Sequence, residues 1–425
     1  MLINRFLKCL LINPDRLKER KYLLFLFMVF CLMIFISVKE GLKIGIMGDF
    51  TVFWNAGNNF LLHNDLYSGI GGARRYIYPP FAAMLFQILA LFPLKVSAGI
   101  MTFINLLLFL FSIYLTQKIF EFYFSDKKKI KQVLILAVIF SFRFFWYHIS
   151  FIQMNEIVFV LSLMGVLFML KNKENPAIIC FVIATFIKVI PIFFLIWLFF
   201  RGNYKTYLKI LVVTVICILI PLIWRGFEMG LQDLNNYYLS FLEPFKEGRV
   251  EAEFHNHSLS SAIYKISLPM EYEPGYDFNI LHLTQDAAKR LYIRSAIIIF
   301  GLFILTLLYQ RIRQRPISFI EVSIVFLTTH LLSGITWEYH LVSLLFVYMS
   351  FLKIGRKVDD KIHIIVQYSL LGIIILNAII GTDTVGRNLY HYFGGYGILT
   401  WMMVLLFIYF LVENVIWTGG EKQSH

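Results

Sequence analysis

Charged residues are scarce in this chain of 425 residues: Asp, Glu, Lys and Arg together make up 15% of it. A soluble domain usually carries about a quarter. Hydrophobic residues make up 59%. They form repeated apolar stretches of the roughly 17–25 residues that a helix needs to cross a bilayer. The composition therefore excludes an ordinary soluble protein and indicates that lipid surrounds much of the chain.

Strict alternation of apolar and polar residues is also missing. Continuous apolar runs such as Leu291–Leu308 and Ile362–Ile380 differ from the period-2 pattern of strands in a membrane β-barrel. Because backbone groups cannot stay unpaired in hydrocarbon, the alternative to a closed barrel is the helix. We therefore predict an all-α, polytopic integral membrane protein.

Cysteine is rare, and none of its four positions shows disulfide or zinc spacing: Cys9, Cys31, Cys180 and Cys217. The net charge is +13, which in a soluble protein would point to nucleic acid. Here the basic residues form short clusters between apolar runs, which is the pattern of cytoplasmic loops. The sequence thus predicts membrane lipids as partners and no nucleic acid.

The basic clusters also predict the topology. The cytoplasmic segments would be Met1–Lys21, Lys127–Lys131, Lys171–Lys173, Arg201–Lys209, Arg311–Arg315 and Lys353–Lys361. We expect both termini in the cytoplasm, an uncleaved first helix, and a location in the plasma membrane. The opposite side then holds a first loop, 39–78, and a large loop, 225–290, within a single transmembrane domain that spans 1–425.

Two apolar segments do not fit simple crossings. Pro79–Leu94 is short, and we expect a half-helix that enters the membrane and returns. Ala177–Phe200 contains Lys188 and Pro191, and a lysine in mid-membrane costs about 2.5–3.5 kcal/mol on insertion scales. A break there would make two short helices with Lys188 at the non-cytoplasmic tip. With both choices the chain crosses about twelve times.

The first loop contains an amphipathic stretch. An interfacial helix on the membrane surface is predicted by one apolar stripe at helical spacing: Phe50, Phe53, Trp54, Gly57, Phe60 and Leu61. Asp49 stands just before this stripe. Asp is favoured as a helix N-cap, and a carboxylate at the water–lipid boundary can also act as a general base. The two roles are compatible, because a cap residue is held rigidly.

Other polar residues near the predicted helix ends have two readings each. Arg74 and Arg75 match the geometry of a lipid phosphate, and they equally suit an interfacial anchor. Gln153 and Asn155 can hydrogen-bond sugar hydroxyls or pair two helices. Lys188 is a candidate for binding an anionic phosphate, or it extends to the interface.

The later part of the chain adds two candidates. His255 and His257 in the large loop have a spacing that is only a weak metal motif. In the cluster Ser333–His340, Trp337 can stack on a sugar, and His340 can bind phosphate or assist proton transfer. The alternative for this cluster is an aromatic belt residue with a polar neighbour.

Taken in order, these residues resemble glycosyltransferase family 87. The resemblance covers roughly Gly48 to His340 and rests on the order and spacing of short motifs: Asp49-Phe50 with Trp54, Leu66-Tyr67, Tyr78-Pro79-Pro80, Gln153 with Asn155, Lys188 with Pro191, Asn256 with Ser258, and Trp337 with His340. The chain departs from the family at Ile152, where a Gly is usual, and at Ser333-Gly334, where Ser-Pro is common.

The resemblance implies a GT-C-like fold and a donor sugar linked through one phosphate to a polyprenol. It implies that a hexose, with mannose favoured, passes to a lipid or glycan hydroxyl on the non-cytoplasmic face, with inversion. Asp49 would be the catalytic carboxylate. The donor phosphate would be bound by Lys188, His340, Arg74 and Arg75. Contacts to sugar or acceptor would come from Trp54, Tyr78, Gln153, Asn155, Asn256, Ser258 and Trp337.

We expect no cofactor and no divalent metal, because Lys188, His340 and one of Arg74 or Arg75 can stabilise the charge on the leaving phosphate. The alternative of another class is a lipid or sugar transporter. Transporters place ionisable residues near the bilayer midplane, often at broken helices. The depth of Lys188, and whether its site opens to both sides, therefore distinguishes the two.

Overall fold

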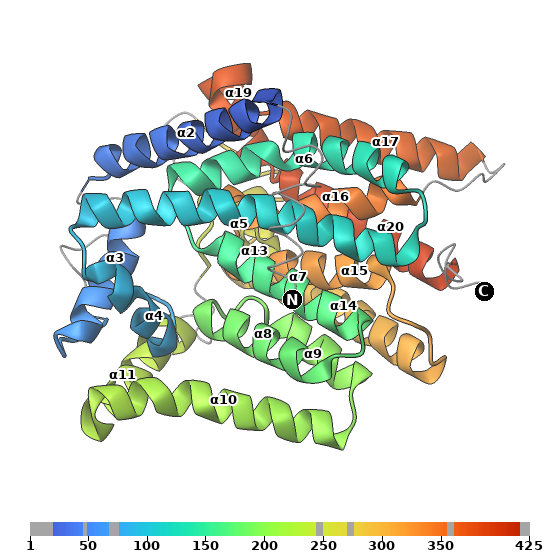
Figure 1. Cartoon of the computed structure of the whole chain (residues 1–425). Helices are drawn as coiled ribbons and strands as arrows, with labels where there is room; N and C mark the ends of the chain where they lie inside the picture. The colour runs from blue at the N-terminus through green and yellow to red at the C-terminus, as the bar shows by residue number, and fades with distance from the viewer. Residues whose placement is uncertain are drawn as a thin grey trace.

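The structure, a computed structural model, describes residues 20–45, 49–67, 76–243, 250–269, 276–354 and 361–416. Within these ranges the regular secondary structure is helical, without strands, which confirms the predicted all-α class (Figure 1). In chain order the helices are α2 (Arg20–Lys43), α3 (Asp49–Leu61), α4 (Pro80–Ala90), α5 (Leu94–Tyr123), α6 (Lys127–Ser150), α7 (Asn155–Leu170), α8 (Glu174–Ile187), α9 (Ile192–Arg201), α10 (Tyr204–Arg225), α11 (Phe227–Tyr237), η1 (Tyr238–Leu242), α13 (Leu259–Ser267), α14 (Gln285–Ile312), α15 (Phe319–Leu331), η2 (Glu338–Ser343), α16 (Leu344–Lys353), α17 (Lys361–Ile379), α18 (Thr382–Val385), α19 (Arg387–Gly395) and α20 (Ile398–Ile416).

Seven helices of the described ranges are long and apolar enough to cross a membrane: α2, α5, α6, α10, α14, α17 and α20. The long helices run along roughly one direction, with α3, α4 and α11 at one end of the bundle (Figure 1). Five shorter apolar helices accompany them: α4, α7, α8, α9 and α15. The chain is therefore an integral membrane protein. The count of about twelve crossings includes shorter segments and stays a prediction.

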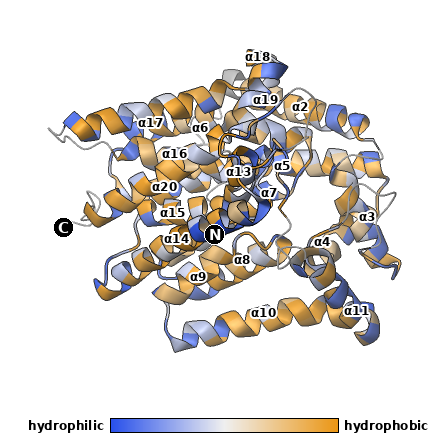
Figure 2. Ribbon diagram, turned by 180° about the vertical axis from the view of Figure 1, so that it is seen from behind, coloured by the Kyte–Doolittle hydropathy of each residue, from blue (hydrophilic) through white to orange (hydrophobic). Residues whose placement is uncertain are grey.

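The outside of the bundle is apolar. Hydrophobic residues cover most of α10, α14 and α17, and hydrophilic ones lie mainly near helix ends (Figure 2). Large side chains such as Leu211, Ile297 and Ile298 are exposed. Exposure to water would cost roughly 25 cal/mol per Å², so these faces suit hydrocarbon. In contrast, α15 is buried along its whole length and forms part of the core.

Helices α8 and α9 form a hairpin. Phe181 of α8 stacks on Phe194 of α9 with ring centroids 5.1 Å apart, and it lies 5.9 Å from Trp197. In one straight helix these residues would be separated by about 20 Å, at ~1.5 Å per residue. The chain therefore reverses between Lys188 and Pro191, which confirms the predicted break.

The apolar stripe of the first loop forms α3, but this face lies against protein. Phe50, Phe53 and Phe60 are buried and pack in one cluster with Phe86 of α4. Gly57 permits this close approach, because a Cβ atom there would lie 2.4 Å from the carbonyl oxygen of Phe86. This part of the stripe is therefore covered by protein, and the place of α3 at the membrane surface stays a prediction. An apolar face in a sequence does not reveal what covers it, and here α4 does.

The segment predicted as a half-helix contains α4, which has 11 residues and is too short to cross alone. Its entry into the membrane stays a prediction.

The first and the large loop meet through Arg225. Its guanidinium donates to the carbonyl oxygens of Asn59 at 2.8 Å and Asn64 at 2.7 Å. Asp233 accepts from its Nε at 2.8 Å. These bonds fix the carboxyl end of α3, which carries Asp49 at its other end.

A buried ion pair lies where α9 ends. Arg201 pairs with Glu321 of α15, and Trp197 donates its indole N–H to the same carboxylate at 2.7 Å. We call the end of the bundle where α9 ends the Arg201 end. The end that contains α3, α4 and α11 is called the Asp49 end.

Candidate active site

Asp49 is the first residue of α3 and is held by an amide. Its Oδ2 accepts a hydrogen bond of 2.9 Å from Gln153 Nε2. The backbone carbonyl of Gln153 accepts from the side-chain amide of Asn105, on α5, at 2.9 Å. The carboxylate is thus oriented by a group that is itself anchored to a long membrane helix.

Lys188 lies in the turn of the α8–α9 hairpin and is buried. Its Nζ donates to Asn155 Oδ1 at 2.7 Å and lies 2.8 Å from His340 Nε2. It also interacts electrostatically with the Asp49 carboxylate. A lysine and a carboxylate that are far apart in the sequence therefore face one site.

The ring of His340 has a fixed orientation, because its Nδ1 accepts from the backbone N–H of Trp337 at 3.1 Å. Two further histidines, His148 and His330, are buried and interact electrostatically with Lys188. Sequence reasoning missed both. The available signal was an ionisable residue inside or at the end of an apolar helix, which is itself a functional-site hypothesis.

Tyr78 covers Lys188 from the first loop. Its ring centroid lies 5.7 Å from Lys188 Nζ, within cation–π range. The backbone carbonyl of Tyr78 accepts from the hydroxyl of Tyr67 at 2.8 Å. Burial and the nearby Asp49 carboxylate raise the pKa of the Tyr78 hydroxyl. At neutral pH this hydroxyl therefore keeps its proton and can donate.

Asn256 and Ser258 are fully buried and hold the backbone that leads into Trp337. Asn256 Oδ1 accepts from the N–H of Thr336 at 2.9 Å, and its Nδ2 donates to the carbonyl of Gly334 at 3.1 Å. Ser258 Oγ donates to the same carbonyl at 3.3 Å. The structure thus places both side chains on a neighbouring turn, and direct contact with a sugar stays a prediction.

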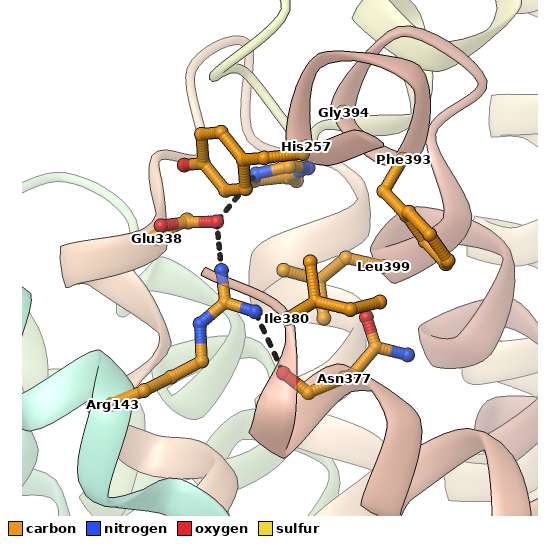
Figure 3. Close-up of a pocket in the computed structure, with 9 residues that line it drawn as sticks. Arg143, His257, Glu338, Asn377, Ile380, Phe393, Gly394 and Leu399 are labelled. Carbon is orange, nitrogen blue, oxygen red and sulfur yellow. Dashed lines mark hydrogen bonds and ion pairs between the residues drawn. The ribbon is translucent and has the colours of Figure 1, made fainter. Parts of the chain in front are cut away.

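Glu338 follows Trp337 and lies between Arg143 and His257 (Figure 3). Arg143 of α6 pairs with its carboxylate and donates to the carbonyl of Asn377, on α17, at 2.6 Å. His257 Nε2 lies 3.7 Å from the same carboxylate oxygen. The sequence places Glu338 within the cluster Ser333–His340 without indicating a role for it, and it gives no sign of Arg143.

The two histidines of the weak metal motif have different surroundings. His255 stacks on Trp337, with ring centroids 5.9 Å apart, whereas His257 faces Glu338. Burial lowers the pKa of His255 to about 4 and also lowers that of His257. Both imidazoles are therefore neutral at pH 7. Among the described residues no three His, Cys, Asp or Glu side chains are grouped so as to hold a metal ion.

The remaining predicted site residues are not part of this cluster or not described. Trp54 donates its indole N–H to the carbonyl of Phe92 at 3.0 Å, which fastens α3 to the connection between α4 and α5. Arg74 and Arg75 lie outside the described residues.

A carboxylate and a lysine thus meet at one end of a helical membrane bundle. The model of glycosyltransferase family 87 matches residues 76–334, more than half of the chain. The chain therefore belongs to this family and is a membrane glycosyltransferase. No curated protein matches it. The matched range includes Gln153 and Lys188, whereas Asp49 and His340 lie outside it.

Proposed function

We propose that this glycosyltransferase transfers a hexose, with mannose favoured, from a polyprenyl-phosphate donor to a hydroxyl of a lipid or glycan acceptor. The reaction takes place on the non-cytoplasmic face of the plasma membrane, and both chain termini lie in the cytoplasm. The observation that carries the proposal is the meeting of Lys188, His340 and Asp49 at one end of a membrane bundle.

The donor phosphate binds to Lys188 and His340. Both side chains are buried, and Asn155 orients Lys188. Charge interactions are stronger in such a site than in water. Preorganised hydrogen-bond donors stabilise the charge that develops on the phosphate as the sugar leaves. Arg74 and Arg75 remain candidates for further contacts with this phosphate.

Asp49 acts as the general base, and Gln153 orients its carboxylate. The acceptor oxygen attacks the anomeric carbon while its proton passes to Asp49. The bond between this carbon and the phosphate oxygen breaks, and its electron pair stays on the phosphate. One displacement of this kind inverts the anomeric configuration. The balance of atoms and electrons is complete without a cofactor or a divalent metal, and we propose neither.

The sugar lies between Tyr78 and Trp337, where ring faces and a hydroxyl donor are available. Gln153 and Asn155 border the same space through their bonds to Asp49 and Lys188. Asn256 and Ser258 act by fixing the turn before Trp337. Trp54 contributes by holding α3 in place.

Transport is the less favoured function. A transporter site would have to open from Lys188 toward both ends of the bundle. Toward the Arg201 end, the hairpin is packed with Phe181, Phe194 and Trp197, all of which are buried. This packing favours a site that is reached from the Asp49 end alone.

Transfer by the purified protein in lipid vesicles tests the proposal. Radiolabelled polyprenyl-phosphate sugars are supplied one at a time, together with membrane lipids or cell-envelope glycans as acceptors. We expect transfer from one of them by the wild type and a rate lower by about 10²–10⁴-fold in Asp49→Asn. Transfer from a nucleotide sugar, with none from any polyprenyl-phosphate sugar, would refute the proposed donor.

A further inference from the structure

Arg143 is an unexpected residue for its position. It lies in α6, a helix long and apolar enough to cross a membrane, and its side chain is only 12% exposed. Its partner Glu338 is 6% exposed. Charges buried in this way lose their hydration, and an ion pair seldom regains more than that loss. A contribution to stability alone is therefore a weak reason for this pair, and its surroundings suggest another.

The pair joins three separate parts of the chain at the turn that bears Trp337 and His340. Arg143 connects α6 to the carbonyl of Asn377, near the end of α17, and to Glu338 at the start of η2. Figure 3 shows Glu338 between Arg143 and His257, with the guanidinium reaching down to Asn377. Arg143 and Glu338 lie 195 positions apart in the sequence, so the contact depends entirely on the fold.

His257 also fixes the turn that bears Trp337 and His340. Its backbone N–H donates to the carbonyl of Thr336 at 2.6 Å, and its own carbonyl accepts from Thr400, on α20, at 2.9 Å. Its ring stands beside the Glu338 carboxylate. The residues on either side of Trp337 are thus fastened to α20 and α6.

The polar groups of this cluster are incompletely used. Arg143 Nε and both ring nitrogens of His257 are buried and lack a hydrogen-bond partner. In contrast, Arg201 at the other end uses its Nε and both terminal nitrogens in hydrogen bonds to Glu321 and the carbonyl of Arg315. Buried groups without partners are costly, and each one calls for an explanation, of which a role in function is one.

We infer that Arg143 and Glu338, assisted by His257, are positioning residues that set the Trp337–His340 turn and thereby the place of the donor phosphate. The link to the phosphate rests on the proposed function. The effect of Arg143 and Glu338 on the turn itself does not rest on the proposed function, and it can be measured without substrate.

Hydrogen exchange followed by mass spectrometry tests the position of the turn. The variants are Glu338→Ala and Glu338→Gln, with Glu321→Ala as the matched control at the Arg201 end. We expect faster exchange over 333–343 in Glu338→Ala and near wild-type exchange in Glu338→Gln, because an amide oxygen still accepts from Arg143. Glu321→Ala should leave this segment unchanged. Unchanged exchange in Glu338→Ala would overturn the inference.

Steady-state kinetics tests the link to the donor. In Glu338→Ala we expect kcat/KM for the polyprenyl-phosphate sugar to fall by about 10²-fold, the effect of a misplacement of roughly 1 Å. The acceptor KM should stay within about twofold, since Asp49 is held elsewhere, and Glu338→Gln should recover most of the activity. Equal losses for donor and acceptor, or in Glu321→Ala as well, would refute positioning.

A milder variant keeps the test open if Glu338→Ala does not fold. His257→Gln retains the backbone bonds and removes only the ring, and we expect a donor KM raised by about tenfold at most with an unchanged acceptor KM. If the wild type is inactive with every polyprenyl-phosphate sugar, the proposed function fails. Exchange over 333–343 then still decides whether Arg143 and Glu338 position the turn.

Discussion

The two ends of the bundle each bury an arginine–glutamate pair, and the pairs differ in how completely they are bonded. At the Arg201 end, Glu321 is fully buried, and both Arg201 and Trp197 donate to it. At the Asp49 end, the pair of Arg143 and Glu338 leaves Arg143 Nε without a partner. The first arrangement closes a packed helix end. The second lies on the turn that bears His340, which binds the donor phosphate in the proposed function.

Because both ends bury a charged pair, burial of charge alone does not identify a functional site. Both pairs would attract attention in a list of ionisable residues in apolar segments. What distinguishes them is whether the hydrogen-bonding groups around the pair are satisfied within the protein. If this difference matters, substitutions at the two ends should have different effects.

The two carboxylates Asp49 and Glu321 should respond in opposite ways to conversion to the amide. Asp49→Asn removes a proton acceptor that contributes about 10²–10⁴-fold to the rate, so transfer should fall by this factor while the melting temperature stays near that of the wild type. Glu321→Gln should lower the melting temperature and leave the specific activity of the folded protein unchanged. The two measurements are transfer rate and thermal unfolding in detergent. Near-normal transfer by Asp49→Asn would show that another group is the base.

The two buried cations, Lys188 and Arg201, should also respond differently to substitution. Lys188→Met removes the charge beside His340, and kcat/KM for the donor should fall by about 10²-fold, the effect of losing one group that stabilises the leaving oxygen. Arg201→Met should instead destabilise the fold by about 3–5 kcal/mol, because it leaves Glu321 buried without its partner. Donor kinetics and unfolding curves check these outcomes. An unchanged donor KM and kcat in Lys188→Met would move phosphate binding to another part of the protein.

Gly57 tests how tightly the Asp49 end is built. Gly57→Ala places a Cβ atom 2.4 Å from the Phe86 carbonyl oxygen, so α3 and α4 must separate at a cost of about 1–3 kcal/mol. The melting temperature and the transfer rate should both fall, because α3 carries Asp49. Gly301→Ala is the control, since a Cβ atom there meets no atom within 4 Å. Equal effects of the two variants would show that the close approach of α3 to α4 does not matter.

Acid should destabilise the protein in part through His257. Burial lowers the pKa of His257, Lys265 and Arg143 lower it further, and Glu338 opposes this shift. His255 also interacts electrostatically with His257. Because the unfolded chain then binds more protons below a pH of about 6.5, the free energy of unfolding falls as the pH is lowered through this value.

Melting temperatures between pH 7 and pH 5 test this effect. The decrease should be smaller in His257→Gln, which cannot take up the proton. Parallel curves for the wild type and this variant would show that protonation of His257 does not limit stability in acid.

Trp54 gives the smallest expected effect. Trp54→Phe keeps an aromatic ring but removes the hydrogen bond to the carbonyl of Phe92. Such a bond is worth about 0.5–1.5 kcal/mol. A small loss of stability with unchanged donor KM is expected in unfolding and transfer assays. A strongly raised donor KM would instead place Trp54 in contact with the sugar.

Much of the fold follows from the sequence because its signals are local. Apolar runs predict the long helices, and Lys188 with Pro191 inside one such run predicts the hairpin turn that the structure contains. The apolar stripe from Phe50 to Phe60 predicts α3, but it does not predict that α4 packs against this face. The apolar face can be recognised in the sequence. The helix that packs against it, α4, begins only at Pro80, and no local pattern connects the two.

The candidate site is only partly predictable for the same reason. Asp49, Gln153, Asn155, Lys188 and His340 stand out as polar residues between apolar runs, and the structure brings them together. The contact between Arg143 and Glu338 bridges 195 positions, and nothing near either residue in the sequence indicates the other.

The hairpin that carries Lys188 also sets a depth. Its second arm, α9, has 10 residues, which is about 15 Å of helix, whereas the hydrocarbon layer is about 30 Å thick. If the hairpin starts at the cytoplasmic surface, its turn lies well below the opposite headgroups. A phosphate bound at Lys188 would then be drawn inward from the plane where lipid phosphates normally rest. With the proposed donor, the prenyl tail would stay in hydrocarbon during this movement, and bulk water, which would otherwise hydrolyse the activated sugar, would be kept at a distance from it.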